Sequence, residues 1–341
     1  MNSRPKLQDS VYAGLVRFPA FLYGFLIGGC GVVVSISTIL IGFLCSFVKP
    51  YGYFPGVFDR ILWYSGIMMV IGLILILTDL FVLLPNKRPR REILWNPPAN
   101  MNLTVVLTAY NDEPSIGLAV EDFRSHPKVK RVIVVDNNSE DRTVAVAGQY
   151  GAQVVHEPLR GYGSCVWRAL QEGSRCTDTE LTLLCEGDMT FRSYDIEKFL
   201  AYLPHVDIVS GTRISEQLRA HRTQLTTFMY YGNFFAGKLL ELKHLGRGTF
   251  TDVGTTYKLC RNTALQHILP LLNPGINLEF NAHFLDTALE SGTTVVECPV
   301  TFHNRIGISK GGNASNRLAL KVGIRMITGI IIGWRKRRET L

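Results

Sequence analysis

A long stretch without a single charged side chain, residues 18–48, is the feature that most constrains how this chain can fold. At about 1.5 Å per residue, a helix of this length exceeds the roughly 30 Å hydrocarbon core of a bilayer. Residues 61–84 form a second apolar stretch, interrupted only by Asp79 near its end. The link between them is rich in proline and glycine, which favour tight turns. The sequence therefore predicts a transmembrane helical hairpin over residues 18–84.

A cleaved signal peptide is the alternative interpretation of the first stretch. The stretch is too long for that role, and a second apolar stretch follows it at once. Basic side chains precede the first stretch and follow the second, which places both ends in the cytoplasm: Arg4, Lys6, Arg17, Lys87, Arg88, Arg90 and Arg91. The seven cysteines, an odd number without a CxxC pair, fit a reducing compartment and argue against a disulfide framework or a zinc site. We therefore expect residues 1–17 to be a cytoplasmic segment and the rest of the chain to follow the hairpin on the same side.

Beyond a proline-containing linker, residues 85–100, the pattern changes to short β-branched runs that alternate with helical segments. The predicted strands are residues 103–108, 129–135, 153–156, 181–184 and 207–210. The predicted helices are residues 115–125, 142–150, 163–174 and 195–203. This alternation predicts a mostly parallel α/β sheet covered by helices, forming one domain over residues 101–312.

Polar side chains gather where three of these strands end. The segments are TAYNDEPS (108–115), VDNNSEDRT (135–143) and CEGD (185–188). Because the carboxyl ends of parallel strands meet at one edge of the sheet, we expect these segments to line one crevice. Glu186 and Asp188, with one glycine between them, can turn toward a single hard cation such as Mg²⁺ or Mn²⁺. The alternative is an ordinary solvated strand end.

These motifs resemble those of the family 2 glycosyltransferases, which have the Rossmann-like GT-A fold. TAYNDE resembles the PAYNE opening of that family, VDNNSEDRT resembles VDDGSxDGT, and EGD occupies the place of DxD. The similarity continues through SGTR, TDVGTTYKL and RIGISK and so covers residues 103–310. Within the family, the chain most resembles the polyprenyl-phosphate sugar transferases of the dolichyl-phosphate mannose synthase type.

The resemblance implies roles for individual residues. Glu186 and Asp188 would hold Mg²⁺ or Mn²⁺ on the diphosphate of a nucleotide sugar, and Asp188 would be catalytic. Asp252, in TDVGTTYKL, matches an aspartate beside the sugar and is a second catalytic candidate. Contacts with the nucleotide sugar are implied for Thr108, Tyr110, Asp112, Asp136, Gly161 and Glu186. The reaction would be one in-line displacement with inversion.

The acceptor follows partly from chemistry. A lipid monophosphate is an anion near pH 7, so it can attack the anomeric carbon without a general base, whereas a hydroxyl group needs one. Cationic positioning then matters most. The residues that match the acceptor-phosphate segments of the family are Arg213, which is also a catalytic candidate, Arg305, Ser309 and Lys310.

The sequence therefore favours transfer from a UDP- or GDP-sugar to undecaprenyl or dolichyl phosphate at the cytoplasmic membrane face. Transfer to a hydroxyl group of a lipid-linked or surface glycan is one alternative. An inactive membrane subunit that binds nucleotide sugar or lipid is another. The sequence leaves the oligomeric state open, with a homo-oligomer among the alternatives.

Four positions depart from the family pattern: Thr108 stands for proline, Asn137 and Glu186 for aspartate, and Tyr162 for lysine. Glutamate still ligates a hard cation, but its extra methylene changes where the carboxylate lies. RIGISK is also one residue shorter between Arg305 and Ser309 than the family form. We expect Glu279 at a surface or helix start and assign no role to His283.

Residues 313–341 are predicted to form an amphipathic helix at the membrane interface and a basic tail. Arg317, Lys321 and Arg325 recur at four-residue spacing beside apolar residues. A helix packed on the catalytic domain is the alternative. The net charge of +8 suits anionic lipid. Because the basic clusters flank apolar segments and lack a nucleic-acid-binding signature, we expect no nucleic-acid partner.

Overall fold

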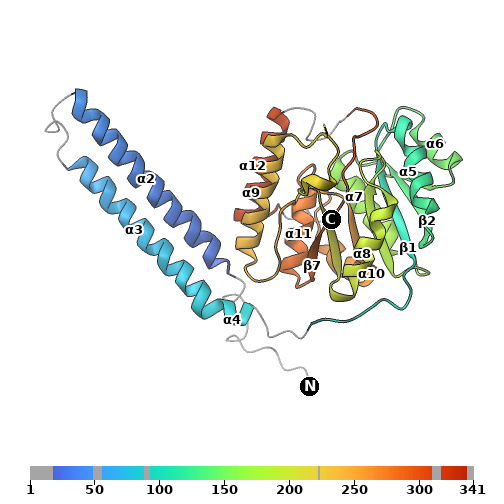
Figure 1. The fold of residues 1–341 in the computed structure, drawn as a ribbon, viewed down its shortest axis with the longest axis horizontal. Helices are drawn as coiled ribbons and strands as arrows, with labels where there is room; N and C mark the ends of the chain where they lie inside the picture. Colours follow the sequence, from blue (N-terminus) through green and yellow to red (C-terminus); the bar gives the residue numbers. More distant parts are fainter. Residues whose placement is uncertain (1–17, 49–55, 88–92, 222, 309–315, 336–341) are drawn as a thin grey trace, which may run out of the picture. The chain divides into compact units, whose positions relative to one another are not determined.

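The computed structural model describes residues 18–48, 56–87, 93–221, 223–308 and 316–335 (Figure 1). These residues divide into two compact units. The first contains the helices up to residue 87, and the second contains nearly all of the described chain from residue 93 onward. Each unit is described by itself below.

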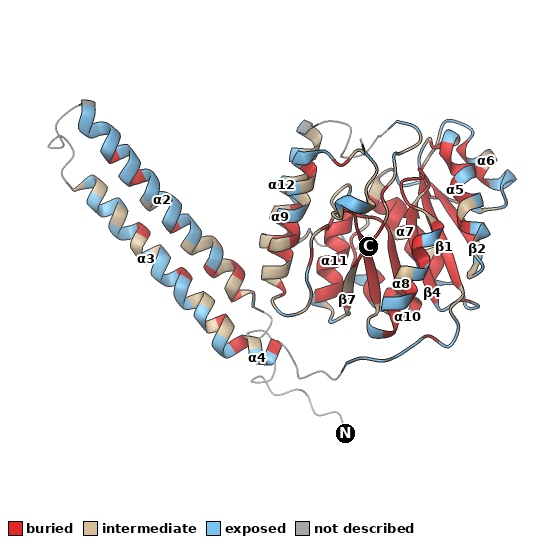
Figure 2. Cartoon of the chain, in the orientation of Figure 1, coloured by how far each residue is buried: buried red, intermediate tan, exposed pale blue. Residues whose placement is uncertain are grey.

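The first unit is a helical hairpin. Helices α2 (Ala20–Val48) and α3 (Val57–Thr78) pack side by side, and the π-helical turn η2 (Asp79–Leu83) and α4 (Leu84–Lys87) continue the second one. The helices approach closely at Gly72, where an added Cβ would lie 2.6 Å from the backbone of Gly28. Figure 2 shows that most of their surface is exposed, although it is apolar. Both are long and apolar enough to cross a membrane.

The one charge predicted to interrupt the second apolar stretch has a partner within this unit. Asp79 is fully buried, and its carboxylate lies 2.7 Å from the ammonium group of Lys87. The same carboxylate accepts a hydrogen bond of 2.7 Å from the amide of Phe21. A buried charge needs this kind of pairing. The π-helical turn begins at Asp79 itself.

The second unit is built on a sheet of seven strands. The strands are β1 (Leu103–Ala109), β2 (Val129–Asp136), β3 (Gln153–His156), β4 (Leu181–Glu186), β5 (Ile208–Thr212), β6 (Lys258–Arg261) and β7 (Val295–Pro299). Their order is β3-β2-β1-β4-β6-β5-β7, with β6 antiparallel to both of its neighbours and the other pairs parallel. The register pairs Thr108 with Glu186 and Ala109 with Asp136, so the polar segments end at one edge.

Helices cover the sheet, whose strands are largely buried (Figure 2). They are α5 (Glu113–Ser125), α6 (Thr143–Gln149), α7 (Tyr162–Ser174), α8 (Ile196–Tyr202), α9 (Thr227–Lys243), α10 (Asn262–Ile268), α11 (Phe280–Glu290) and α12 (Asn316–Ile332). The predicted mostly parallel α/β architecture is confirmed, with element ends displaced by a few residues. Strands β6 and β7 and helices α9 and α10 lie in segments for which the sequence predicted no element.

The C-terminal helix α12 belongs to this second unit. It packs against α11, and the indole of Trp334, just beyond its end, donates a hydrogen bond of 2.6 Å to Asp286. The described part of the C-terminal segment is thus packed on the second unit, as one of the two alternatives from the sequence predicted. Its contact with a membrane stays a prediction.

Gly163, in the first turn of α7, can be used to test how closely this helix packs against the segment before α11. A Cβ at this position would lie 1.6 Å from the carbonyl oxygen of Ile276. Because backbone must shift to admit it, we expect Gly163→Ala to lower the free energy of unfolding by about 1–3 kcal/mol. Thermal unfolding of the purified protein measures this. The control is Gly148→Ala in α6, where the added Cβ meets open space; equal losses in both variants would contradict the packing.

Candidate active site

A cavity of about 680 Å³ lies at the carboxyl ends of the strands. Its polar end includes Asp112, Glu186, Asp188, Arg213 and Arg305. These residues come from the loop after β1, the end of β4 and its following loop, the end of β5 and the segment after β7. The sheet therefore brings together residues that lie up to nearly two hundred positions apart in the chain.

The two carboxylates predicted as metal ligands have different environments. Asp188 is 1% exposed, and its Oδ1 accepts hydrogen bonds from the amide and the hydroxyl of Thr190 at 3.0 and 2.5 Å. Burial, and then the nearby Glu186, raise the pKa of Asp188 to about 7. Glu186 is half-buried at the end of β4. Two adjacent carboxylates in such a place favour a shared cation.

Arg305 forms ion pairs with two carboxylates of the site, Asp112 and Asp188. Its Nη2 lies 2.7 Å from Oδ1 of Asp112, and its Nη1 lies 3.0 Å from Oδ2 of Asp188. Burial alone would lower the pKa of Arg305, but Asp188 and Asp112 raise it above its ordinary value. The residue predicted to bind the acceptor phosphate thus joins two loops of the site.

Arg213 and Asp252, both predicted as catalytic, form a buried ion pair. Nε of Arg213 lies 2.7 Å from Oδ2 of Asp252, and Nη2 lies 2.7 Å from Oδ1. Burial alone would raise the pKa of Asp252, but Arg213 outweighs it and holds the pKa below its ordinary value. Arg213 lines the cavity, whereas the fully buried Asp252 does not. Asp252 thus lies outside the cavity lining and holds the guanidinium group of Arg213 in place.

Glu297, on β7, fixes the loop that carries Asp252. Its carboxylate accepts hydrogen bonds from the amide of Thr251 at 2.8 Å and from the amide of Asp252 at 2.9 Å. Burial raises the pKa of Glu297 to about 7, although these hydrogen bonds act in the opposite direction. Sequence reasoning missed Glu297 because no motif surrounds it.

The remaining predicted residues fall into three groups. Thr108, Tyr110 and Gly161 line the cavity. Asp136 is 2% exposed and accepts a hydrogen bond of 3.3 Å from the amide of Ser139, and its neighbour Asn137 lines the cavity instead. Ser309 and Lys310 lie outside the described residues.

Backbone strain marks the same loops. Three described residues other than glycine have positive φ: Asn111 at 52°, Asn138 at 63° and Met189 at 66°. They follow β1, β2 and β4, respectively. Asparagine tolerates this conformation, but for methionine it is uncommon and costs energy. Such strain is found preferentially at functional sites.

Sequence reasoning also missed Tyr162, Thr256 and Asn281, which line the cavity beside Glu186. They come from α7, the loop before β6 and α11, so no contiguous motif marks them. Tyr162 attracted notice only as a departure from the family pattern.

One wall of the cavity is apolar. Helix α9 contributes Phe228, Met229 and Phe235, and α12 contributes Leu320, Ile324 and Ile327 among others. Phe228, Phe235, Leu320 and Ile324 remain 49–56% exposed. A contiguous apolar surface of this kind commonly marks an interaction site.

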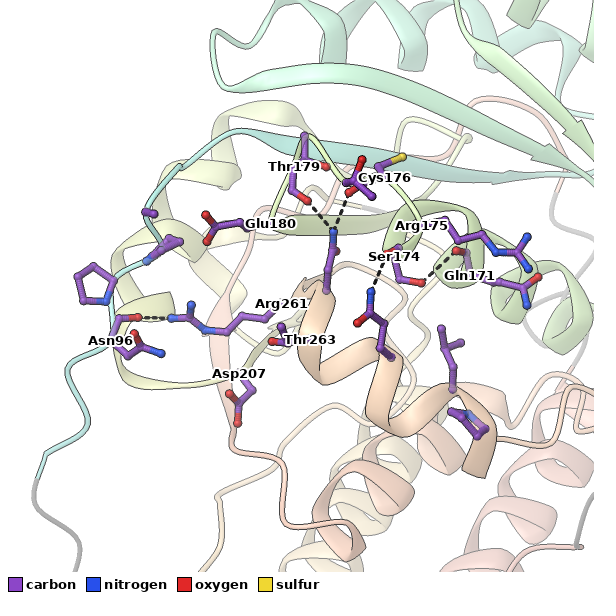
Figure 3. A pocket seen from close by; sticks show the side chains of 18 of the residues that line it. Asn96, Gln171, Ser174, Arg175, Cys176, Thr179, Glu180, Asp207, Arg261 and Thr263 are labelled. Carbon is purple, nitrogen blue, oxygen red and sulfur yellow. Dashed lines mark hydrogen bonds between the residues drawn. The ribbon is translucent and has the colours of Figure 1, made fainter.

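A second hollow, of about 1150 Å³, lies at the other end of β4 (Figure 3). Its central side chain, Arg261, donates hydrogen bonds to the carbonyl groups of Asn96 and Leu203. Its neighbour Asn262 donates a hydrogen bond of 2.8 Å to the carbonyl of Thr179. Figure 3 shows hydrogen bonds between residues that line this hollow. Arg261 and Asn262 thus connect the segments around it.

A family model and several known proteins resemble parts of this chain. Residues 104–269 match the family model described as glycosyl transferase family 2. The chain is 30% identical to the protein RfbJ of Shigella flexneri over 116 residues, which cover 33% of this chain and 87% of that protein. It is 26% identical to the dolichyl-phosphate hexose transferase of Haloferax volcanii over 231 residues, which cover 65% of this chain and 93% of that protein.

Other relatives are matched less fully. The chain is 38% identical over 112 residues to an uncharacterized glycosyltransferase of Mycobacterium bovis, and the match spans 33% of this chain and 48% of that protein, about half its length. A solved structure of glucosyl-3-phosphoglycerate synthase from Mycobacterium tuberculosis, in complex with Mn²⁺, UDP and phosphoglyceric acid, gives a TM-score of 0.50 at 16% identity. That similarity covers 67% of this chain and 78% of the other. It concerns the fold alone and confirms the predicted GT-A architecture.

The pairing of Arg213 with Asp252 can be tested by removing one partner. We expect Asp252→Asn to lower the free energy of unfolding by about 3 kcal/mol, because it leaves a buried guanidinium group uncompensated. Thermal unfolding measures the loss.

The matched control is Asp178→Asn, which removes the exposed partner of Arg131 and should cost less than about 1 kcal/mol. A stable Asp252→Asn variant that has lost only its activity would instead favour a direct catalytic role for Asp252.

Proposed function

We propose that this chain, which belongs to glycosyl transferase family 2, transfers a sugar from a nucleotide sugar to the phosphate group of a polyprenyl phosphate. The observation that carries the proposal is the two-sided cavity. Its polar end has two arginines beside carboxylates, and its apolar wall is formed by α9 and α12. A phosphate group at one end and a hydrocarbon chain along the other would satisfy both surfaces.

A phosphate acceptor would explain why arginine side chains line the polar end of the cavity. A phosphate monoester is largely dianionic above pH 6, so it needs cations to orient it and no base to activate it. Arg213 is held by Asp252 through Nε and Nη2, and its Nη1 makes no hydrogen bond within the described part of the chain. We assign this free end, with Arg305, to the acceptor phosphate. The named activity of the Haloferax volcanii relative supports the same acceptor class.

The donor set fits a hard divalent cation. Oδ2 of Asp188 contacts Arg305, and Oε2 of Glu186 accepts no hydrogen bond from the described residues. Carboxylate oxygens are the ligands that Mg²⁺ and Mn²⁺ prefer. Glu186 and Asp188 would hold the ion, which when bound would neutralise charge on the departing diphosphate. Thr190 orients Asp188 for this task through two hydrogen bonds.

The residues then favour a direct displacement. A phosphate oxygen of the acceptor forms the new bond to the anomeric carbon, and the bond from that carbon to the diphosphate breaks. The nucleoside diphosphate leaves with the electron pair. Because the acceptor oxygen attacks in line, from the side opposite this leaving group, the configuration inverts. Thr108, Tyr110 and Asp112, together with Gly161, would contact the nucleotide part of the donor, and buried Asp136 would fix the loop beside it. The helical hairpin would anchor the enzyme, with its catalytic domain in the cytoplasm.

The purified protein should convert a nucleotide sugar and a polyprenyl phosphate into a sugar-linked lipid. A panel of UDP- and GDP-sugars with undecaprenyl and dolichyl phosphate, followed by mass measurement of the lipid, tests this. Asp188→Asn should lower turnover more than about 100-fold, because it weakens a direct metal ligand. The exposed Asp178→Asn variant is the control and should keep its turnover.

The lability of the product separates the acceptors. A sugar on a lipid phosphate should be released by mild acid, whereas a sugar on a glycan hydroxyl should not. An acid-stable product would support the hydroxyl acceptor and contradict the proposal. The absence of an adduct with every donor in the panel would contradict transfer to a lipid phosphate altogether.

A further inference from the structure

The carboxylate of Glu186 is anchored at one oxygen only. Its Oε1 lies within hydrogen-bond distance of two hydroxyl groups, 2.7 Å from that of Thr256 and 3.3 Å from that of Tyr162. The two hydroxyl groups are also hydrogen-bonded to each other. No hydrogen bond from the described residues reaches Oε2. The carboxylate thus has one oxygen turned to the protein and one left for a ligand.

Asn281, on α11, directs these hydroxyl groups. Its Nδ2 donates a hydrogen bond of 2.8 Å to the hydroxyl of Tyr162 and lies 3.3 Å from the hydroxyl oxygen of Thr256. The same nitrogen lies 3.1 Å from the carbonyl oxygen of Gly254. Because a carbonyl oxygen can only accept, the amide orientation is fixed chemically. A lone pair of Tyr162 faces Asn281. Each hydroxyl group has a single proton, so one proton lies between the two hydroxyl oxygens and the other points to Oε1 of Glu186.

Lys258 fixes the other end of that amide. It is a fully buried residue of β6, and its ammonium group donates to Oδ1 of Asn281 at 3.2 Å and to the carbonyl oxygen of Thr255. Among the described residues, Lys258 forms no ion pair with a carboxylate; its hydrogen-bond partners are the two oxygens just named. Burial lowers its pKa to about 8. A buried lysine without an ionic partner is costly. The four side chains form a directed series: Lys258 donates to Asn281, Asn281 donates to Tyr162, and the bonded pair of hydroxyl groups donates one proton to Glu186.

We propose that Lys258, Asn281, Tyr162 and Thr256 are positioning residues that aim Oε2 of Glu186 at the divalent cation. The inference rests on the proposed metal-dependent transfer. It accounts for the glutamate that stands where the family pattern has aspartate. A glutamate has one more rotatable bond, and fixing its rotamers costs entropy. Anchoring Oε1 restricts these rotamers before the ion arrives. Tyr162 takes part through its hydroxyl group, which a lysine at this position would lack.

The affinity for Mn²⁺ alone tests this without any turnover. Purified full-length protein is titrated with Mn²⁺, and the free ion is followed by electron paramagnetic resonance. Thr256→Val removes the closest donor to Glu186 and keeps the side-chain shape. We expect a rise in the Mn²⁺ dissociation constant of about 10- to 100-fold, as is usual when a residue that orients a metal ligand is removed. Thr256→Ser keeps a hydroxyl group and should restore most of the affinity.

Two further variants keep the test independent of folding. Thr104→Val is the matched control. This substitution removes an equally buried hydroxyl group, whose hydrogen bond of 2.8 Å to Thr179 lies at the end of β1 away from the cavity. It should bind Mn²⁺ like the wild type. Tyr162→Phe removes only the phenolic oxygen and should raise the dissociation constant severalfold even if Thr256→Val fails to fold.

The outcomes separate the two proposals. Wild-type affinity in both Thr256→Val and Tyr162→Phe, with binding still lost in Asp188→Asn, would overturn the positioning role and leave the metal-dependent function intact. Two results would overturn both proposals: no binding of Mn²⁺ by the wild-type protein, or the same Mn²⁺ affinity in the wild type and in Asp188→Asn. Weaker binding in Thr256→Val, wild-type binding in Thr104→Val and recovery in Thr256→Ser would support the inference.

Discussion

Several carboxylates converge on one edge of the sheet, and the cost of burying them governs the rest of the site. Each negative charge there needs a cation or several hydrogen-bond donors. Asp252 has Arg213 at 2.7 Å, and Asp188 has Arg305 at 3.0 Å. Glu186 has only hydroxyl donors, at one of its two oxygens. The uncompensated charge lies where a nucleoside diphosphate would need a metal ion.

The ion pairs and hydrogen bonds that offset these buried charges also connect the site residues to strands of the sheet. Arg213 can face the cavity because Asp252 holds it from behind, and Asp252 is held in turn by Glu297 on β7. Lys258 on β6 supports Glu186 in a similar way, because it donates a hydrogen bond to Asn281, which holds the hydroxyl groups beside Glu186. Both strands that the sequence failed to predict thus carry residues that support the site. The apolar wall formed by α9 and α12 completes the cavity and makes a hydrocarbon acceptor reasonable.

The strands and the polar residues at their ends could be predicted from the sequence, whereas contacts between residues far apart in the chain could not. The strands β1 to β5 are short apolar runs, and their polar carboxyl ends reveal Asp112, Glu186 and Asp188 as neighbours by topology alone. The bond between Tyr162 and Asn281 joins residues 119 positions apart, and no spacing rule reveals such a pair. Strand β6 escaped prediction because Lys258, a buried cation, makes its sequence resemble a solvated segment. Helix α12 was predicted as amphipathic, but the sequence could not decide what its apolar face would contact.

The account depends on one cation shared by Glu186 and Asp188. A crystal structure of the purified protein with Mn²⁺ and UDP, recorded at a wavelength where manganese scatters anomalously, tests that claim most directly. The account predicts one anomalous peak within coordination distance of Oε2 of Glu186 and of the Asp188 carboxylate. A peak bound elsewhere, or none beside these two residues although UDP is bound, would contradict it.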